Sequence, residues 1–271
     1  MSLRDAGPVL LVGAGKMGGA LLQGWLGRDL EPARVAVLDP APPDEVRSLL
    51  DARGISLNPT ELPPAQVAVL AVKPQIMDGV LEKLGARLGP ETLVLSIAAG
   101  KTVDGIAAHL GGRRAIVRAM PNTPAAIGRG MSVLVANEAV TPEQRALAEA
   151  LLAAVGAVEW VANEALLDAV TAVSGSGPAY VFLLAECLAE AARAAGLPGP
   201  LSEKLARETV AGAGALLTAS ELSAATLREN VTSPGGTTAA ALAVLMGERG
   251  LAALMKEAVA AAARRSAELS V

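Results

Sequence analysis

Three glycines near the N-terminus have a spacing that could hold a phosphate group. Gly13, Gly15 and Gly18 form a GxGxxG pattern between the apolar run PVLLV and a helical stretch that extends to about Gly27. There the first glycine permits a tight turn, the second lets a pyrophosphate approach the backbone, and the third lets helix and strand pack closely. A simple packing turn is the alternative to a dinucleotide site. The predicted cofactor contacts are Gly13, Ala14, Gly15, Lys16, Met17 and Gly18.

An acidic residue follows the second apolar run, where a ribose would lie. Asp39 ends the segment RVAVLD. Its carboxylate could accept hydrogen bonds from a ribose 2′-hydroxyl and would repel a 2′-phosphate. No Arg or Lys stands between Asp39 and Arg47 to bind such a phosphate, so the sequence slightly favours NADH and leaves NADPH open. Asp39 also precedes Pro40 and could instead begin a turn.

Three further segments, AVKP, SIAAG and MPNTP, lie where apolar runs end. Ligands of open parallel sheets bind beyond the carboxyl ends of the strands. Small residues would let a flat ring approach the backbone, and Asn122 can hydrogen-bond an amide. Each segment alone could be an ordinary loop, but all three together favour a cofactor site. The candidates are Ala71, Val72, Lys73, Pro74, Ala98, Ala99, Gly100 and Asn122.

Two segments of the second half, SGSGP and SPGGTT, are suited to ending one helix and starting the next. Each could then present unpaired N–H groups and the positive end of a helix dipole. Together they could bind a small carboxylate without an arginine. Either segment alone is more often an ordinary helix cap.

The elements that must position these residues change character near residue 163. Up to residue 162, β-branched runs alternate with Ala/Leu-rich stretches: PVLLVG, RVAVLD, QVAVLAV, TLVLSI, AIVRAM, MSVLVA and GAVEWV. This alternation predicts an α/β fold, a Rossmann-type doubly wound, mostly parallel sheet over residues 1–162. Residues 163–271 predict an all-helical domain. Because Ala-rich helices bury little area each, we expect this domain to intertwine with a second copy; a self-sufficient bundle is the alternative.

The composition argues against several classes of function. The chain has 271 residues, of which 52% are hydrophobic, and a net charge of −4, so we expect a soluble protein without a basic field for nucleic acid. A single cysteine, Cys187, expected in a core, and a single histidine, His109, expected at a helix end or the surface, argue against a metal site. The uncharged stretch 169–185 contains SGSGP, which should interrupt a membrane-spanning helix. The N-terminus has no cleavable signal pattern, so we expect a cytoplasmic protein.

The motifs GAGKMG, AVKPQ, SIAAG, RAMPNTPA, AVSGSGPAYVF and NVTSPGGTT follow one another along nearly the whole chain. In this combination the sequence resembles the pyrroline-5-carboxylate reductase family. The resemblance implies hydride transfer from NAD(P)H to 1-pyrroline-5-carboxylate, a cyclic imino acid, which gives L-proline in the last step of proline biosynthesis. It also implies homodimers that assemble into decamers through the helical domain.

The resemblance also implies roles for individual residues. Asn58 would lie near the adenosine ribose, and Glu221 would reach the substrate across the dimer contact. Many relatives carry Ser, Asn or Arg where Asp39 stands, which keeps the choice between NADH and NADPH open. The implied imino-acid contacts are Ser174, Gly175, Glu221, Gly236, Thr237 and Thr238.

The expected mechanism is mainly positioning, because the cofactor carries the hydride chemistry. A protonated imine is already electrophilic, and Thr238 is the candidate catalytic residue that hydrogen-bonds its nitrogen. A β-hydroxyacid dehydrogenase is the enzymatic rival, but it usually needs a lysine early in the second domain, and residues 163–192 contain none. A noncatalytic dinucleotide sensor is the rival from another class, but it would need no second anion pocket.

Overall fold

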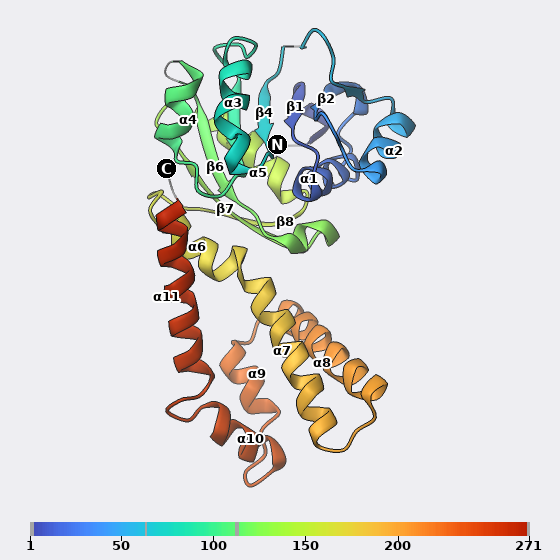
Figure 1. Ribbon diagram of the computed structural model, residues 1–271, viewed down its shortest axis with the longest axis vertical. Helices are drawn as coiled ribbons and strands as arrows, with labels where there is room; N and C mark the ends of the chain where they lie inside the picture. Colours follow the sequence, from blue (N-terminus) through green and yellow to red (C-terminus); the bar gives the residue numbers. More distant parts are fainter. Residues whose placement is uncertain (1–2, 63, 112–113, 270–271) are drawn as a thin grey trace. The chain divides into compact units, whose positions relative to one another are not determined.

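The apolar runs of the first half form one eight-stranded sheet in the computed structural model (Figure 1). Its order is β3-β2-β1-β4-β5-β6-β7-β8, and every neighbouring pair is parallel except β6 and β7. The strands are β1 (Val9–Val12), β2 (Val35–Leu38), β3 (Ser56–Leu57), β4 (Val67–Leu70), β5 (Leu93–Ser96), β6 (Ile116–Met120), β7 (Gly130–Ala136) and β8 (Gly156–Trp160). The predicted α/β class and mostly parallel sheet are therefore confirmed.

The structure describes residues 3–62, 64–111 and 114–269, which divide into two units. The first unit holds Met1–Gly175 together with Ala262–Val271, and the second holds Ser176–Ala261. The first unit contains the sheet and its covering helices, so every residue expected at a strand end belongs to it.

Helices cover both faces of the sheet because successive strand residues point to opposite sides. On one face, α1 (Lys16–Leu26), α2 (Asp44–Arg53) and α5 (Pro142–Ala153) pack in one core with Leu11 of β1. On the other face, α3 (Pro74–Gly85) and α4 (Val103–Leu110) pack with Leu10. The first core includes the buried Trp25, whose Nε1–H donates to Leu151 O at 2.8 Å. These two cores cover the two faces of the sheet.

From residue 163 to residue 269, a stretch described without gaps, the chain forms helices and no strand. The helices are α6 (Leu166–Val170), α7 (Gly177–Ala194), α8 (Gly199–Ala219), α9 (Ala224–Asn230), α10 (Thr237–Leu245) and α11 (Leu251–Leu269). Within the second unit, α7 and α8 lie side by side (Figure 1). The segment LPGPLS leads from α7 into α8, and SPGGTT leads from α9 into the first residues of α10, so these two predicted helix boundaries are confirmed.

The prediction that SGSGP ends one helix and starts the next is confirmed in part: a π-helical turn ends at Gly175 and α7 begins at Gly177, but no loop separates them. Thr171–Gly175 forms a π-helical turn, η4, and the helix continues through it from Leu166 to Ala194. Proline is tolerated because Pro178 is the second residue of α7, where no intrahelical bond from its nitrogen is needed. The reason given above against a membrane-spanning helix therefore fails: among the described residues, Leu166–Ala194 is one helix long and apolar enough to cross a membrane.

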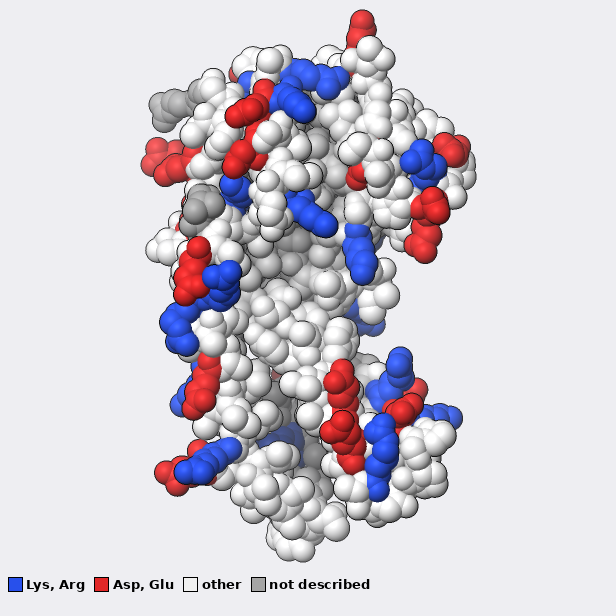
Figure 2. Space-filling view, in the orientation of Figure 1, with Lys and Arg blue, Asp and Glu red and all other residues white. Residues whose placement is uncertain are grey.

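Charged side chains of both signs are interspersed on the visible face of the protein (Figure 2). Cys187, expected in a core, is exposed on α7. Helix α7 also exposes the large apolar side chains Val181, Phe182, Leu183, Leu184 and Leu188. In this one chain, α7 therefore has an apolar surface that its own unit does not bury.

Candidate active site

The glycine-rich loop has the geometry that its spacing predicts. Gly13 has a φ of +91°, and a side chain there would meet Ala71 O at 2.7 Å. A side chain at Gly18 would collide with Gly13 O. At Gly15, by contrast, an added Cβ would have no atom within 4 Å. Two glycines thus serve turn and packing, while Gly15 leaves open backbone at the start of α1, which fits a pyrophosphate.

Asp39 is hydrogen-bonded to this glycine-rich loop. Its Oδ2 accepts the N–H of Ala14 at 2.6 Å, and its Oδ1 accepts the N–H of Ala41 at 2.8 Å. The second hydrogen bond closes a turn through Pro40, so Asp39 does begin a turn, which was the alternative role expected from the sequence. Each carboxylate oxygen has a second lone pair that could accept a hydrogen bond from a ribose.

Asn58 supports Asp39 from the end of β3. Its Nδ2 donates to Asp39 O at 2.7 Å, and its Oδ1 accepts Asp39 N–H at 2.9 Å. Asn58 has a φ of +50°, a conformation that Asn tolerates better than most residues. The structure therefore brings Asn58, Asp39 and Ala14 together at one corner of the sheet edge.

The three other strand-end segments lie along the same edge. Ala71 follows β4, Ile97 follows β5 and Pro121 follows β6, and these three strands follow β1 in the sheet in that order, each parallel to the one before. The carboxyl ends of parallel neighbours share one edge, so their loops lie beside the Gly13 turn. Lys73 is exposed as the N-cap of α3. Gly100 has a φ of +73°, and a side chain there would meet Leu269 O of α11 at 2.7 Å.

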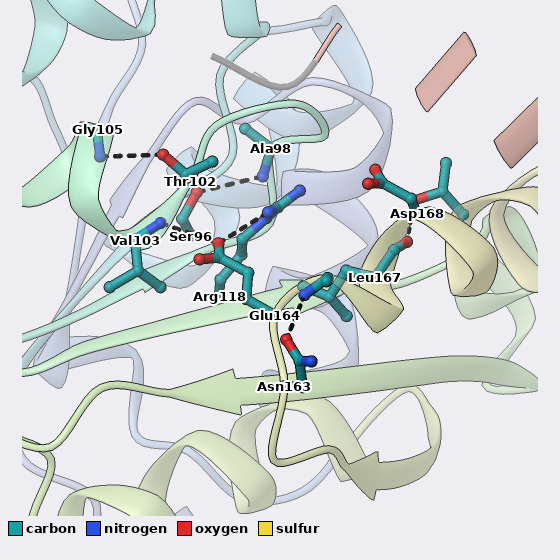
Figure 3. A network of polar contacts seen from close by, with 12 residues as sticks. Ser96, Ala98, Thr102, Val103, Gly105, Arg118, Asn163, Glu164, Leu167 and Asp168 are labelled. Atoms are coloured by element: carbon teal, nitrogen blue, oxygen red, sulfur yellow. Dashed lines mark hydrogen bonds and ion pairs between the residues drawn. The ribbon is translucent and has the colours of Figure 1, made fainter. Parts of the chain in front are cut away.

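A network of polar contacts joins β6, the start of α4 and the segment before α6 (Figure 3). Arg118 of β6 and Glu164, just before α6, point toward one another and join at 2.8 Å. Glu164 Oε1 also accepts the N–H of Val103, the first residue of α4, at 2.9 Å. This ion pair was not predicted from the sequence. Its one signal was a charged residue inside the apolar run AIVRAM, which does not identify the partner.

Asn122 and Ser174 meet although they lie far apart in the sequence. Asn122 Nδ2 is 3.2 Å from both the carbonyl oxygen and the hydroxyl oxygen of Ser174. Asn122 Oδ1 accepts the N–H of Met131 at 2.9 Å. A side chain at Gly175 would meet the Met120 Cε atom at 2.6 Å. The strand-end segment MPNTP therefore contacts the segment SGSGP.

The other expected substrate residues lie in the second unit. Glu221 is exposed in the loop before α9. Gly236 is the N-cap of α10 and has no side chain with which to cap it. Thr237 and Thr238 form the start of the helix, and Thr238 is half-buried. The first N–H groups of α10 have no intrahelical acceptor and could bind a carboxylate.

A second titratable cluster lies between α3 and α4. Lys101 Nζ is 2.9 Å from both carboxylate oxygens of Asp78, and His109 Nε2 is 3.9 Å from Asp78 Oδ1. The hydrogen bond from Lys101 lowers the pKa of Asp78 below its usual value of 3.8. His109 occupies the last turn of α4, as expected. Among the described residues, no group of three or more His, Cys, Asp or Glu side chains could hold a metal ion.

Two family models match the chain. The model for pyrroline-5-carboxylate reductase dimerisation matches residues 164–269. The model described as NADP oxidoreductase coenzyme F420-dependent matches residues 8–100. The two matches together cover the glycine-rich loop and every helix from α6 to α11.

Relatives match over nearly the whole length. Pyrroline-5-carboxylate reductase of Pseudomonas aeruginosa is 40% identical over 97% of this chain and 96% of its own length, and that of Synechocystis is 42% identical over 96% and 97%. A solved pyrroline-5-carboxylate reductase of Coxiella burnetii is 38% identical with a TM-score of 0.91, covering 98% of this chain and 100% of its own. Plasmodium falciparum pyrroline carboxylate reductase with NADP bound is 26% identical with a TM-score of 0.82, covering 99% of each. The chain therefore belongs to the pyrroline-5-carboxylate reductase family.

Proposed function

We propose that this chain reduces 1-pyrroline-5-carboxylate to L-proline with NAD(P)H, the last step of proline biosynthesis. The observation that carries the proposal is the 40% identity to a pyrroline-5-carboxylate reductase over 97% of the chain. The open backbone at Gly15 supports it, because a reductase of this kind needs room for a pyrophosphate beside the strand edge.

The cofactor would lie along the carboxyl edge of the sheet. When bound, it supplies the hydride. The start of α1 would hold the pyrophosphate, and Asp39 with Asn58 would hold the adenosine ribose. We propose NADH as the slightly preferred cofactor because the Asp39 carboxylate would repel a 2′-phosphate. The proposed contacts are Gly13, Ala14, Gly15, Lys16, Met17, Gly18, Asp39, Asn58, Ala71, Val72, Lys73, Pro74, Ala98, Ala99 and Gly100; the amide of Asn122, also expected here from the sequence, is instead hydrogen-bonded to Ser174 and Met131.

The imino acid would be held mainly by main-chain groups. Amides at the start of α10 would bind the carboxylate, since the positive end of a helix dipole favours an anion. Thr238, the proposed catalytic residue, would accept a hydrogen bond from the protonated imine nitrogen and fix the ring for hydride transfer. The proposed contacts are Ser174, Gly175, Glu221, Gly236, Thr237 and Thr238.

The proposal also covers the oligomeric state of the protein and its location in the cell. Residues 1–162 would bind the dinucleotide, and residues 163–271 would bind substrate and form a homodimer that assembles into a decamer. The match to a dimerisation model and the exposed apolar side chains of α7 support the dimer. We propose that these side chains meet a second copy rather than a membrane, that nucleic acid is not a partner, and that the protein works in the cytoplasm. Sedimentation velocity would test the assembly.

A cofactor-oxidation assay tests the activity. The purified protein is given pyrroline-5-carboxylate with NADH and, separately, with NADPH, and absorbance at the dihydropyridine band is followed. We expect oxidation of the reduced cofactor with the cyclic imino acid. When β-hydroxyacids are supplied with NAD+ or NADP+ instead, we expect no formation of reduced cofactor. Turnover of hydroxyacids alone would favour the dehydrogenase, and tight cofactor binding without any turnover would favour the sensor.

A further inference from the structure

We infer that Asn122 is a positioning residue: it holds the carbonyl and hydroxyl of Ser174 in a π-helical turn and acts on the imino acid through Ser174. The inference rests on the proposed function, in which Ser174 contacts the substrate. It differs from the role expected from the sequence, in which Asn122 would bind an amide of the cofactor.

The Ser174 carbonyl is denied its ordinary helical partners. In an α-helix it would accept the N–H of residue 178, but Pro178 has no N–H. In a π-helix it would accept the N–H of residue 179, but Ala179 N–H donates to Ser176 O at 3.0 Å. A carbonyl left in this way needs another donor.

Asn122 supplies that donor. Its Nδ2 lies 3.2 Å from Ser174 O and 3.2 Å from Ser174 Oγ, so the side chain contacts both polar groups of the serine. Its Oδ1 is fixed in turn by the N–H of Met131 on β7 at 2.9 Å. The amide is thereby oriented by the sheet, and the serine is oriented by the amide.

The turn also packs against the end of β6. A side chain at Gly175 would meet the Met120 Cε atom at 2.6 Å, so backbone and strand end lie close together. Thr171 Oγ1 donates to Leu167 O at 2.7 Å within the same helical run. π-Helical turns occur frequently at functional sites. The turn therefore lies against the strand end, and Asn122 provides polar contacts between them.

The test removes the Nδ2 donor of Asn122 and keeps its Oδ1 acceptor. Asn122→Asp retains an oxygen for Met131 N–H but replaces the Nδ2 donor by an oxygen that repels the Ser174 carbonyl. We expect KM for pyrroline-5-carboxylate to rise about tenfold, the size of one lost hydrogen bond to a buried group. L-Proline binding, measured by calorimetry, should weaken by a similar factor. NADPH binding, measured by fluorescence without substrate, should stay within about twofold of wild type.

Asn137→Asp is the matched control. Asn137 stands at the other end of the β6–β7 pair, where its Oδ1 accepts Ile116 N–H at 3.1 Å and its Nδ2 donates to Arg114 O at 2.8 Å. The same chemical change there should lower thermal stability without raising KM. An equal rise in KM for both variants would mean that a general loss of strand order, not Ser174, is the cause.

A second variant tests the inference in case Asn122→Asp folds poorly. Pro178→Ala gives the helix an N–H that can compete with Asn122 for Ser174 O, and alanine is a strong helix former. We expect a severalfold rise in KM with unchanged NADPH binding. Weakened NADPH binding in Asn122→Asp, or unchanged imino-acid kinetics in both variants, would overturn the inference. A wild-type protein that does not reduce pyrroline-5-carboxylate would instead overturn the proposed function, and the inference with it.

Discussion

Glu164 Oε1 lies 2.8 Å from Nη1 of Arg118, whose side chain is only 5% exposed. The same oxygen accepts the N–H of Val103 at the start of α4. One carboxylate therefore ties β6, α4 and the segment before α6 together. Through these two contacts, the Glu164 carboxylate gives the buried guanidinium a counter-charge and the first N–H of α4 an acceptor.

Loss of this carboxylate should destabilise the protein. Glu164→Ala leaves Arg118 buried without its counter-charge, and we expect the free energy of unfolding to fall by about 2–3 kcal/mol, toward the lower end for buried pairs because Glu164 itself is partly exposed. Glu268→Ala is the control, since Glu268 pairs with Arg265 at 2.9 Å on the exposed surface of α11. It should cost less than about 1 kcal/mol. Urea denaturation at one protein concentration measures both, and equal losses would contradict the structural role.

Gly15 should separate cofactor binding from folding. Gly15→Ala adds a methyl group where no atom of the chain lies within 4 Å, so thermal stability should stay near that of wild type. The same methyl group would occupy the approach of the pyrophosphate, and we expect the dissociation constant for NADPH to rise at least about tenfold. Gly13→Ala is the contrast, because the positive φ and Ala71 O oppose any side chain there. It should lower stability and binding together, whereas normal NADPH binding by Gly15→Ala would remove Gly15 from the site.

Asp39 should influence the choice between NADH and NADPH through its charge. Asp39→Asn removes the charge but keeps an oxygen that can accept the Ala14 N–H. We expect the ratio of kcat/KM for NADPH to that for NADH to rise at least about fivefold, the size of repulsion between neighbouring charges in water. Asp39→Ser shortens the side chain and should shift the ratio in the same direction. An unchanged ratio in both variants would show that Asp39 serves only the turn through Pro40.

The pattern of the sequence predicted the elements because each rests on local chemistry. Alternating β-branched and Ala/Leu-rich runs predicted seven strands, and the spacing of the glycines predicted the turn at Gly13 and the close packing at Gly18. The strand β3 was missed because Ser56–Leu57 has only two residues and carries no periodicity.

Contacts between residues far apart in the chain could not be predicted from the sequence, for a physical reason. The partner of Arg118 is fixed by the sheet and by the path of the chain into α6, and nothing near residue 118 specifies residue 164. The contact at SGSGP is of the same kind: Gly and Pro indicate a helix boundary locally, but nothing near residue 174 specifies that the donor to the Ser174 carbonyl is Asn122, at a distant strand end.

Asp78 should make the protein less stable in acid. The hydrogen bond from Lys101 lowers the pKa of Asp78 below 3.8, so the folded protein holds that proton less tightly than the unfolded chain. The resulting stabilisation is present above about pH 4 and is lost as the pH falls through the lowered pKa. Urea denaturation between about pH 6 and pH 3 should show a shallower loss of stability for Asp78→Asn than for wild type.

Lys101→Met provides the control for the acid response. Without the lysine, the main cause of the lowered pKa is gone, and adding Asp78→Asn should no longer change the pH dependence. If Asp78→Asn alters the profile equally with and without Lys101, the ion pair is not the origin of the effect.

Thr238 offers the sharpest test of the proposed mechanism, because the mechanism assigns different roles to its side chain and its main chain. The N–H groups at the start of α10 remain in Thr238→Ala, so binding of the substrate carboxylate should persist while the imine nitrogen loses its partner. We expect kcat to fall about 100-fold, the usual effect of removing one hydrogen bond to the reacting group, with little change in NADPH binding. Thr238→Ser keeps the hydroxyl and should recover most of the turnover. A Thr238→Ala protein with wild-type kcat, or a Thr238→Ser protein as slow as the alanine variant, would mean that the hydroxyl does not align the imine.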